Sequence, residues 1–209
     1  MKKQPDYDLA LEYAFRRLRT ELSPNLTYHS YWHSRFEVMR AVRRMARQNA
    51  LPVQEVRLLE VGAAFHDIGF VISDVDHEML GASIAQQALP DFGFQPKHIE
   101  RVVGLIMATR LPQTPHNLLE QILADADLDV LGRRDFFDRS EHLRQELISL
   151  GKGFSPKDWY AIQRDFLRSH AYFTPQAQML RQPGKERHID RLSKLLRDGR
   201  ELATPLAQG

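Results

Sequence analysis

The 209-residue sequence predicts an all-α fold, a single compact helical domain of about nine or ten helices. Apolar residues recur every three or four positions over most of the chain, which is the spacing of amphipathic helices. No two runs of alternating β-type residues are joined by a hairpin turn. The length suits one domain over residues 1–209, and no repeat, low-complexity tract or long linker divides it.

The first three helices are expected in the N-terminal third of the chain. In DYDLALEYAFRRLRTEL, Leu9, Tyr13 and Leu18 lie near one face, and the SPNL segment then breaks the helix. A second helix is expected over about residues 30–49, with arginines opposite its apolar side. A third, more apolar helix covers about residues 54–67, and Gly69 can end it as a C-terminal glycine.

The remaining helices follow a segment, FVISDVD, that is expected to be a loop or a short extended piece. They are predicted at about residues 77–89, 96–109, 116–131, 135–150, 155–170 and 185–202. SPKD at 155–158 has the form of a capping box with proline at the first helical position. TPQAQML begins a further short helix in the same way.

Composition excludes several classes of function. Lysine and arginine number 29 against 27 aspartates and glutamates, so the net charge of +2 gives no strong basic field, and long nucleic acids are not expected as partners. The absence of cysteine excludes disulfides, thiolate metal sites and cysteine nucleophiles, and it suits a reducing compartment. No signal peptide or run of roughly 18 apolar residues is found, so a cytoplasmic protein without membrane contact is expected.

The oligomeric state stays open at this stage. The apolar faces of the first and last predicted helices either cover the core or form a homodimer, and the sequence does not choose between these alternatives.

Polar residues interrupt apolar helices at three places. VGAAFHDIGF ends in His66 and Asp67, which either cap a helix end or hold a metal ion. YHSYWH places His29 and His33 four residues apart, on one face if the segment is helical, although both could simply pack as aromatic rings. LADADLDVLG brings Asp127 onto the face of a buried-looking helix.

Of the three aspartates in LADADLDVLG, Asp125 and Asp129 are expected to be ordinary surface or capping acids. Asp127 shares the apolar face of Leu123 and Leu131, where an uncompensated carboxylate would be costly and a cation would offset that cost. Two imidazoles and two carboxylates from three helices therefore predict a divalent metal site. Such a mixed set favours Mn, Fe, Co, Ni or Zn over Mg.

Taken in chain order, His33, then His66-Asp67, then Asp127, these motifs resemble the HD-domain phosphohydrolase superfamily. YHSYWH resembles the YHN-x-x-H opening of several HD branches, and AAFHDIGF resembles their central motif. HEMLGASIAQQAL resembles the helix that follows, and LADADLDVLG resembles the segment with the distal aspartate. The resemblance covers about residues 28–132 and is far more specific than any one motif.

The resemblance implies roles for individual residues. The positions of the four metal ligands are matched by His33, His66, Asp67 and Asp127, with Asp67 also counted as catalytic. His29 matches the residue that protonates the leaving oxygen in the cyclic-nucleotide phosphodiesterase branch, although Ser30 replaces the asparagine of that motif. Glu78 matches an acidic residue near the substrate or bridging water, and the alternative is a helix-start carboxylate favoured by the helix dipole.

The sequence departs from the family pattern at two points. The HD-x-x-E-D signature of guanosine-tetraphosphate hydrolases is absent, which disfavours that branch. Binuclear HD enzymes carry further histidines between the central motif and the distal aspartate. His77, His98 and His116 fall in that interval without a clean match, so a second metal stays open, with His77 and His116 as its candidates.

Arg110, Arg133 and Arg134 follow the site-bearing helices and are candidates for phosphate binding, with helix-end arginines as the alternative. The predicted function is a metal-dependent phosphohydrolase that acts on a nucleotide or another small phosphorylated metabolite through a metal-activated water. The alternatives are a non-catalytic HD-type nucleotide-binding or regulatory module, and a structural protein in which His66 and Asp67 cap a helix.

Overall fold

The computed structural model describes residues 4–198, and the all-α prediction is confirmed there: this part of the chain contains no strand. Nine α-helices follow one another: α1 (Tyr7–Glu21), α2 (Met39–Gln48), α3 (Val53–Phe65), α4 (His77–Ala88), α5 (Pro96–Met107), α6 (Leu118–Asp127), α7 (Phe136–Ser149), α8 (Pro156–Ser169) and α9 (Pro175–Asp198). Four short elements join them: the π-helical η1 (His33–Val38) and the 3-10 helices η2 (Ile68–Val71), η3 (Leu89–Phe92) and η4 (Asp129–Gly132).

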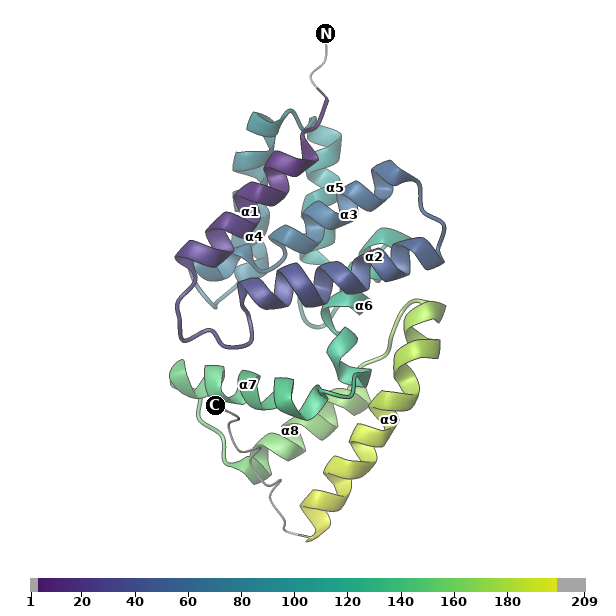
Figure 1. The fold of residues 1–209 in the computed structure, drawn as a ribbon. Helices are drawn as coiled ribbons and strands as arrows, with labels where there is room; N and C mark the ends of the chain where they lie inside the picture. The colour runs from purple at the N-terminus through teal and green to yellow at the C-terminus, as the bar shows by residue number, and fades with distance from the viewer. Residues whose placement is uncertain (1–3, 199–209) are drawn as a thin grey trace.

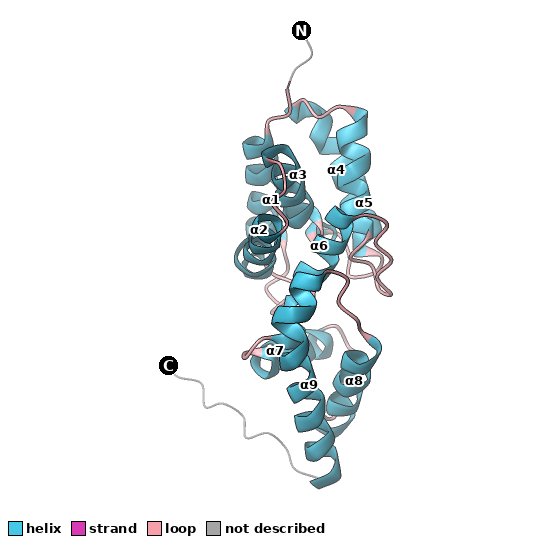
Figure 2. Cartoon of the chain, turned by 90° about the vertical axis from the view of Figure 1, so that its right-hand side faces the viewer, coloured by secondary structure: helices cyan, strands magenta, loops and turns pink. Residues whose placement is uncertain are grey.

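The helices form two groups along the long axis of the molecule (Figure 1). Helices α1–α6 make the larger group, α7–α9 make the smaller one, and the same division is seen after a quarter turn in Figure 2. One cluster of buried apolar residues runs through both groups, from Met39, Phe65 and Ile122 to Phe136 and Leu167. No helix among residues 4–198 is long and apolar enough to cross a membrane.

Local capping explains where several helices begin. The Asp6 side chain accepts a hydrogen bond from the Leu9 amide at the start of α1. Asn117 accepts bonds from the second and third amides of α6. Ser155 is the N-cap of α8 with Pro156 directly after it, as the SPKD segment predicts.

The end of the chain differs from the sequence prediction. The two helices expected near 175 and over 185–202 are one helix, α9, with Pro183 inside it, and residues 199–202 lie outside the described part. Proline removes a hydrogen bond within the helix, but packing against η4 and α8 holds both halves in line. The contact with η4 is backbone to backbone, since a Cβ on Gly184 would lie 2.0 Å from the carbonyl oxygen of Gly132.

The expected role of Gly69 was wrong, whereas FVISDVD is mostly the loop that the sequence predicts as one alternative, with η2 covering its first two residues. Helix α3 ends at Phe65, and Gly69 lies inside η2 without a left-handed conformation. A Cβ at this position would lie 1.9 Å from the carbonyl oxygen of His77. Glycine is therefore required because η2 and the start of α4 touch through their backbones, which brings His77 beside the His66-Asp67 pair.

Candidate metal centre and adjoining cavity

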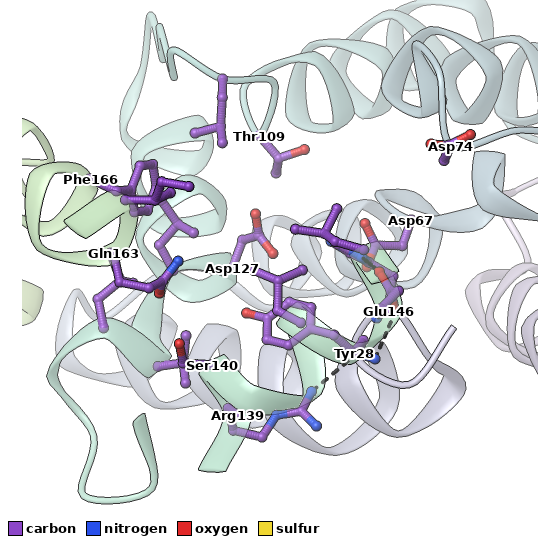
Figure 3. Close-up of a pocket in the computed structure, with 18 of the residues that line it drawn as sticks. Tyr28, Asp67, Asp74, Thr109, Asp127, Arg139, Ser140, Glu146, Gln163 and Phe166 are labelled. Carbon is purple, nitrogen blue, oxygen red and sulfur yellow. Dashed lines mark hydrogen bonds and ion pairs between the residues drawn. The ribbon is translucent and has the colours of Figure 1, made fainter. Parts of the chain in front are cut away.

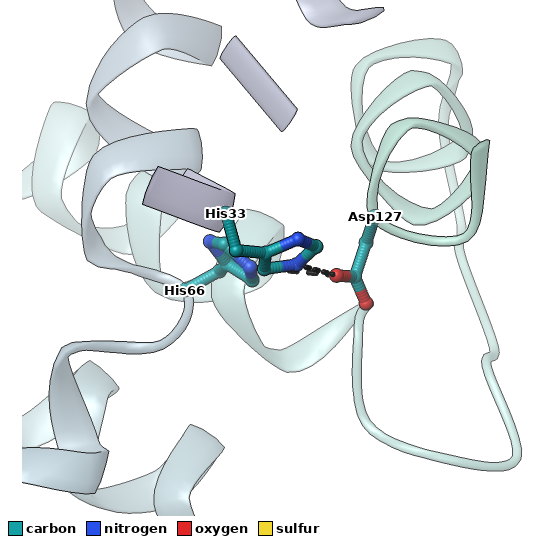
Figure 4. Close-up of side chains that lie close together, drawn as sticks. All are labelled: His33, His66 and Asp127. Carbon is teal, nitrogen blue, oxygen red and sulfur yellow. Dashed lines mark hydrogen bonds and ion pairs between the residues drawn. The ribbon is translucent and has the colours of Figure 1, made fainter. Parts of the chain in front are cut away.

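The structure brings the four predicted metal ligands together from three parts of the chain. His33 begins η1, His66 and Asp67 directly follow α3, and Asp127 is the last residue of α6. One donor atom from each of His33, His66 and Asp127 lies within 4.8 Å of the other two (Figure 4). Asp127 Oδ1 is 3.2 Å from His33 Nε2 and 3.4 Å from His66 Nε2. Asp67 Oδ2 is 3.1 Å from His66 Nε2 and 3.8 Å from His33 Nε2.

Hydrogen bonds outside the cluster hold both imidazole rings in place. His66 Nδ1 donates to the carbonyl oxygen of Ala63 at 2.9 Å, and His33 Nδ1 donates to Glu37 Oε2 at 3.1 Å. With the proton on Nδ1, each neutral ring turns an Nε2 lone pair toward the carboxylates. This is the usual arrangement of metal-binding histidines, whose second nitrogen is bonded to a carbonyl or a carboxylate.

Two buried atoms of the cluster, His66 Nε2 and Asp67 Oδ2, make no hydrogen bond of acceptable geometry among the described residues, although they lie 3.1 Å from each other. The side chains of His66 and Asp67 are only 1% and 5% exposed, so bulk water does not satisfy them. An unpaired buried polar atom is costly, and a native protein normally satisfies it. A divalent cation among these nitrogen and oxygen atoms would satisfy both, so the residues fit a metal ion.

The two carboxylates of the cluster, Asp67 and Asp127, favour positive charge on or between the neighbouring side chains. Burial by itself would lower the pKa of His66, but Asp67 and Asp127 raise it well above its ordinary value. Burial by itself would raise the pKa of Asp67, but the neighbouring histidines, chiefly His66, hold it far below its ordinary range. Protons on the rings or a metal ion between the side chains can supply this charge.

His29 stands in the turn before η1, where a glutamate from α7 holds it. Its Nδ1 is 2.5 Å from Glu146 Oε1, and the amides of Tyr28 and His29 donate to Glu146 Oε2 at 2.8 and 3.0 Å. Burial would raise the pKa of Glu146, but the hydrogen bond from His29 lowers it. The ring of His29 stacks on Phe70, and Phe70 stacks on His77. Nothing in the local sequence around Glu146 indicates this role, because its partner is 117 residues away.

Of the candidate residues after the central motif, Glu78 and His77 lie beside the cluster. His77 Nε2 is 3.4 Å from Glu78 Oε1 and 3.8 Å from Asp67 Oδ1. His116, the other candidate for a second metal, has a side chain that is 84% exposed and pairs with Glu120. The unmatched His98 accepts a hydrogen bond from the amide of Gln95 at the start of α5.

The sequence suggested that Asp125 and Asp129 are ordinary surface or capping acids. The structure shows instead that both are buried. Asp125 accepts hydrogen bonds from the amides of Phe173 and Thr174 and from the Thr174 hydroxyl, which ties α6 to the start of α9. Asp129 forms ion pairs with Arg44 and Arg181. Local spacing could not reveal these partners, which lie in segments far away in the sequence.

A cavity of about 410 Å³ opens beside the cluster, between the two groups of helices (Figure 3). Its polar end is formed by His29, Asp67, Glu78 and Asp127. The rest is mainly apolar, and its walls come from η4, α7 and α8. The residues there include Leu128, Leu131, Phe136, Leu143, Leu147, Trp159, Ile162 and Phe166, with Ser140 and Gln163 between them.

The three arginines predicted for phosphate binding do not line this cavity. Arg110 is paired with Asp76, while Arg133 and the exposed Arg134 line a different hollow. The cations on the cavity wall are Arg139 and Lys152. Both belong to the segment after residue 132, where the resemblance noted in the sequence ends.

A family model described as the HD domain matches residues 31–129, which include all four clustered residues. Residues 31–129 form an HD domain. The match begins after His29 and ends before α7, so the apolar walls from α7 and α8 lie outside the HD segment.

Two solved structures share the fold of this HD-domain chain. A predicted HD superfamily hydrolase from an uncultured Thermotogales bacterium is 22% identical, with a TM-score of 0.58, over 96% of this chain and 97% of that one. Bacillus subtilis YpgQ, solved in complex with ADP, is 18% identical with a TM-score of 0.61, over 96% of this chain and all of that one. A comparison with curated proteins gives no match.

Proposed function

We propose that this HD-domain chain is a metal-dependent phosphohydrolase that acts on a nucleotide or another small phosphorylated metabolite. The observation that carries the proposal is the pair of unsatisfied buried atoms, His66 Nε2 and Asp67 Oδ2, next to a cavity whose polar end Asp67 lines. A helix cap would satisfy these atoms within the protein, and a purely structural core would not leave both of them unsatisfied beside a cavity.

His33, His66, Asp67 and Asp127 would hold the ion, and the two imidazoles favour Mn, Fe, Co, Ni or Zn over Mg. When bound, the ion supplies Lewis acidity that polarises a phosphoryl oxygen and lowers the pKa of a coordinated water. Glu37 and the Ala63 carbonyl keep the two Nε2 atoms directed at the ion by accepting the Nδ1 protons.

His29 is the candidate proton donor to the leaving oxygen. Glu146 accepts its Nδ1 proton, which fixes the ring and leaves Nε2 as the atom that exchanges a proton with the substrate. Glu78, buried at the same end of the cavity, is the candidate acceptor for a proton of the attacking water. The guanidinium of Arg139 and the ammonium of Lys152 supply positive charge for the phosphate.

The apolar part of the cavity indicates what the phosphate is attached to. Trp159, Phe166 and Ile162 offer flat and aliphatic surfaces for an aromatic ring, and the 7%-exposed Gln163 offers an amide for its polar edge. YpgQ, which has the same fold, binds ADP in its crystal structure. Both observations support a nucleotide over a sugar phosphate, whose hydroxyl groups would need more polar partners.

The test is metal analysis of protein purified without added metal, beside His66→Ala and Asp67→Ala. His116→Ala is the matched control because its ring is exposed and lies away from the cluster. Each sample is assayed on nucleotides and a generic phosphodiester with Mn, Co, Ni, Zn and Mg. We expect near-stoichiometric metal and hydrolysis in the parent and control, and loss of both in the two site variants.

The alternative is a non-catalytic HD-type module that binds a nucleotide without hydrolysing it. Metal and nucleotide binding without turnover under any of these ions would favour that module. A parent protein that binds no metal and hydrolyses no compound would refute the phosphohydrolase.

A further inference from the structure

A second hollow, of about 660 Å³, lies behind the metal centre between the η1–α2 segment and α7. Its walls carry six arginines against three carboxylates. The arginines are Arg40, Arg44, Arg133, Arg134, Arg139 and Arg181, and the carboxylates are Glu37, Asp129 and Asp135. The hollow therefore has an excess of three positive charges, although the whole chain is close to neutral. Such a local excess favours an anionic ligand.

Part of this positive charge has no partner within the protein. Arg44 and Arg181 pair with Asp129, and Arg133 pairs with Glu37 and Asp135. The exposed Arg40 and Arg134 have no ion pair or side-chain hydrogen bond among the described residues. In addition, the buried Nε of Arg44 has no hydrogen-bond partner there. Guanidinium groups bind phosphate oxygens through paired hydrogen bonds, so phosphate is the anion that suits them best.

An exposed aromatic surface adjoins these arginines. Trp32 is 60% exposed, which is unusual for so large an apolar ring, and its ring centroid lies 4.5 Å from that of Phe36. Trp32, directly before η1, Phe36 in η1 and Arg40 in α2 are spaced four residues apart, and all three line the hollow. Aromatic rings beside cations form the usual platform for a nucleobase that carries phosphates.

We propose that this hollow is a second, non-catalytic binding site for a nucleoside polyphosphate. The base stacks on Trp32 and Phe36, and the phosphates bind Arg40, Arg133 and Arg134. No histidine-carboxylate cluster capable of holding a metal lines the hollow in the described part of the chain, so the ligand is bound there without being hydrolysed. The site accounts for Arg133 and Arg134, which the cavity of the proposed phosphohydrolase does not use.

The hollow and the metal centre share one side chain. Glu37 accepts the Nδ1 proton of His33 on Oε2, and it pairs with Arg133 through Oε1 and with Arg139 through Oε2. A phosphate that binds Arg133 competes with Glu37 for that guanidinium. A ligand in the hollow is thus separated from a metal-ligating ring by a single carboxylate.

The test uses Trp32 as a local reporter. The chain has two tryptophans, so Trp159→Phe leaves Trp32 as the only one. ADP, adenosine and inorganic tripolyphosphate are titrated in EDTA, in the absence of free metal. We expect ADP to quench Trp32 saturably and to bind more tightly than either adenosine or tripolyphosphate, because only ADP carries both the base and the phosphates.

The decisive variant is Arg40→Ala/Arg134→Ala, with Arg16→Ala/Arg19→Ala on the exposed face of α1 as the control of equal charge. Loss of two charge-assisted contacts should weaken ADP binding about tenfold or more, and the control should bind like the parent. If Trp159→Phe fails to fold, calorimetry of ADP binding to the two double variants with both tryptophans gives the same decision. No quenching or heat from ADP, or equal affinity in both double variants, would overturn the second site.

Discussion

The hydrogen bond from His33 to Glu37 gives a direct prediction about metal affinity. The side chain of Glu37 is only 9% exposed. Burial alone would raise its pKa, but the bond from His33 and the charges of Arg139 and Arg133 lower that pKa to about 2. Glu37 is therefore ionised at neutral pH, and its charge makes His33 Nε2 a stronger ligand.

Glu37→Gln keeps the size of the side chain and removes its charge. The amide oxygen of the glutamine can still accept the hydrogen bond from His33. Because it carries no negative charge, it no longer neutralises Arg133 and Arg139 and polarises the His33 ring less. Loss of such an outer partner typically weakens metal binding about 10- to 100-fold, which corresponds to about 1.4–2.7 kcal/mol. We expect a weakening in this range for Mn²⁺ or Co²⁺.

The assay is competition between metal-free protein and a chelator of known affinity at pH 7.5, with circular dichroism to verify folding. Glu21→Gln is the matched control, since Glu21 is exposed and, within residues 4–198, pairs only with Arg17 on the same helix. Glu21→Gln should bind metal like the parent. A change of less than about threefold in folded Glu37→Gln would refute the argument that the ligand strength of His33 depends on this carboxylate.

Three further predictions concern stability. Gly69→Ala should lower the free energy of unfolding by about 3 kcal/mol or more, because the added Cβ would lie 1.9 Å from a backbone oxygen. Gly153→Ala is the control, since a Cβ there meets open space, and equal effects of the two substitutions in urea unfolding would contradict the close contact. Asp125→Ala should lower the free energy of unfolding by about 3 kcal/mol, because two amides and a hydroxyl lose their buried acceptor. Substitution of the exposed Asp138 by alanine is the control, and a loss below about 1 kcal/mol would show that water replaces the Asp125 carboxylate. Burial lowers the pKa of His170 to about 4, so the folded state binds fewer protons than the unfolded state between pH 6.5 and 4, and stability falls as the pH falls through that window. The loss should be about 3 kcal/mol by pH 4 and should be absent from His170→Asn, so that parallel pH curves for the two proteins would contradict it.

The helices were largely predictable because each is encoded locally. Apolar spacing located most of them to within a few residues, and the cap of α8 is visible as SPKD. The predicted helix over 116–131 instead begins at Leu118, after the N-cap Asn117. The prediction failed where packing overrides local preference. Pro183 suggests a break, yet the contact of Gly184 with Gly132 holds α9 as a single helix.

The candidate metal ligands were also identifiable from the sequence, but their surroundings were not. His66 and Asp67 stand out because polar residues at the end of an apolar helix need a partner, and Asp127 stands out on an apolar face. Glu37 and Glu146, which orient His33 and His29, look like ordinary helix-surface glutamates in the sequence. Asp125 and Asp127 are two residues apart and alike in sequence, yet one anchors α9 and the other faces the histidines.

The sequence by itself determined the all-helical architecture and the chemistry of the clustered side chains, because helical periodicity and ligand type are properties of local residues. Only the tertiary structure decided which side chains share a cavity, since these contacts join residues about 100 positions apart, such as His33 with Asp127 and His29 with Glu146. The tertiary structure also decided that Arg133 and Arg134 line the second hollow instead of the cavity beside the metal centre. The physical reason is that an arginine's neighbours depend on how whole helices pack, and local spacing carries no record of that packing.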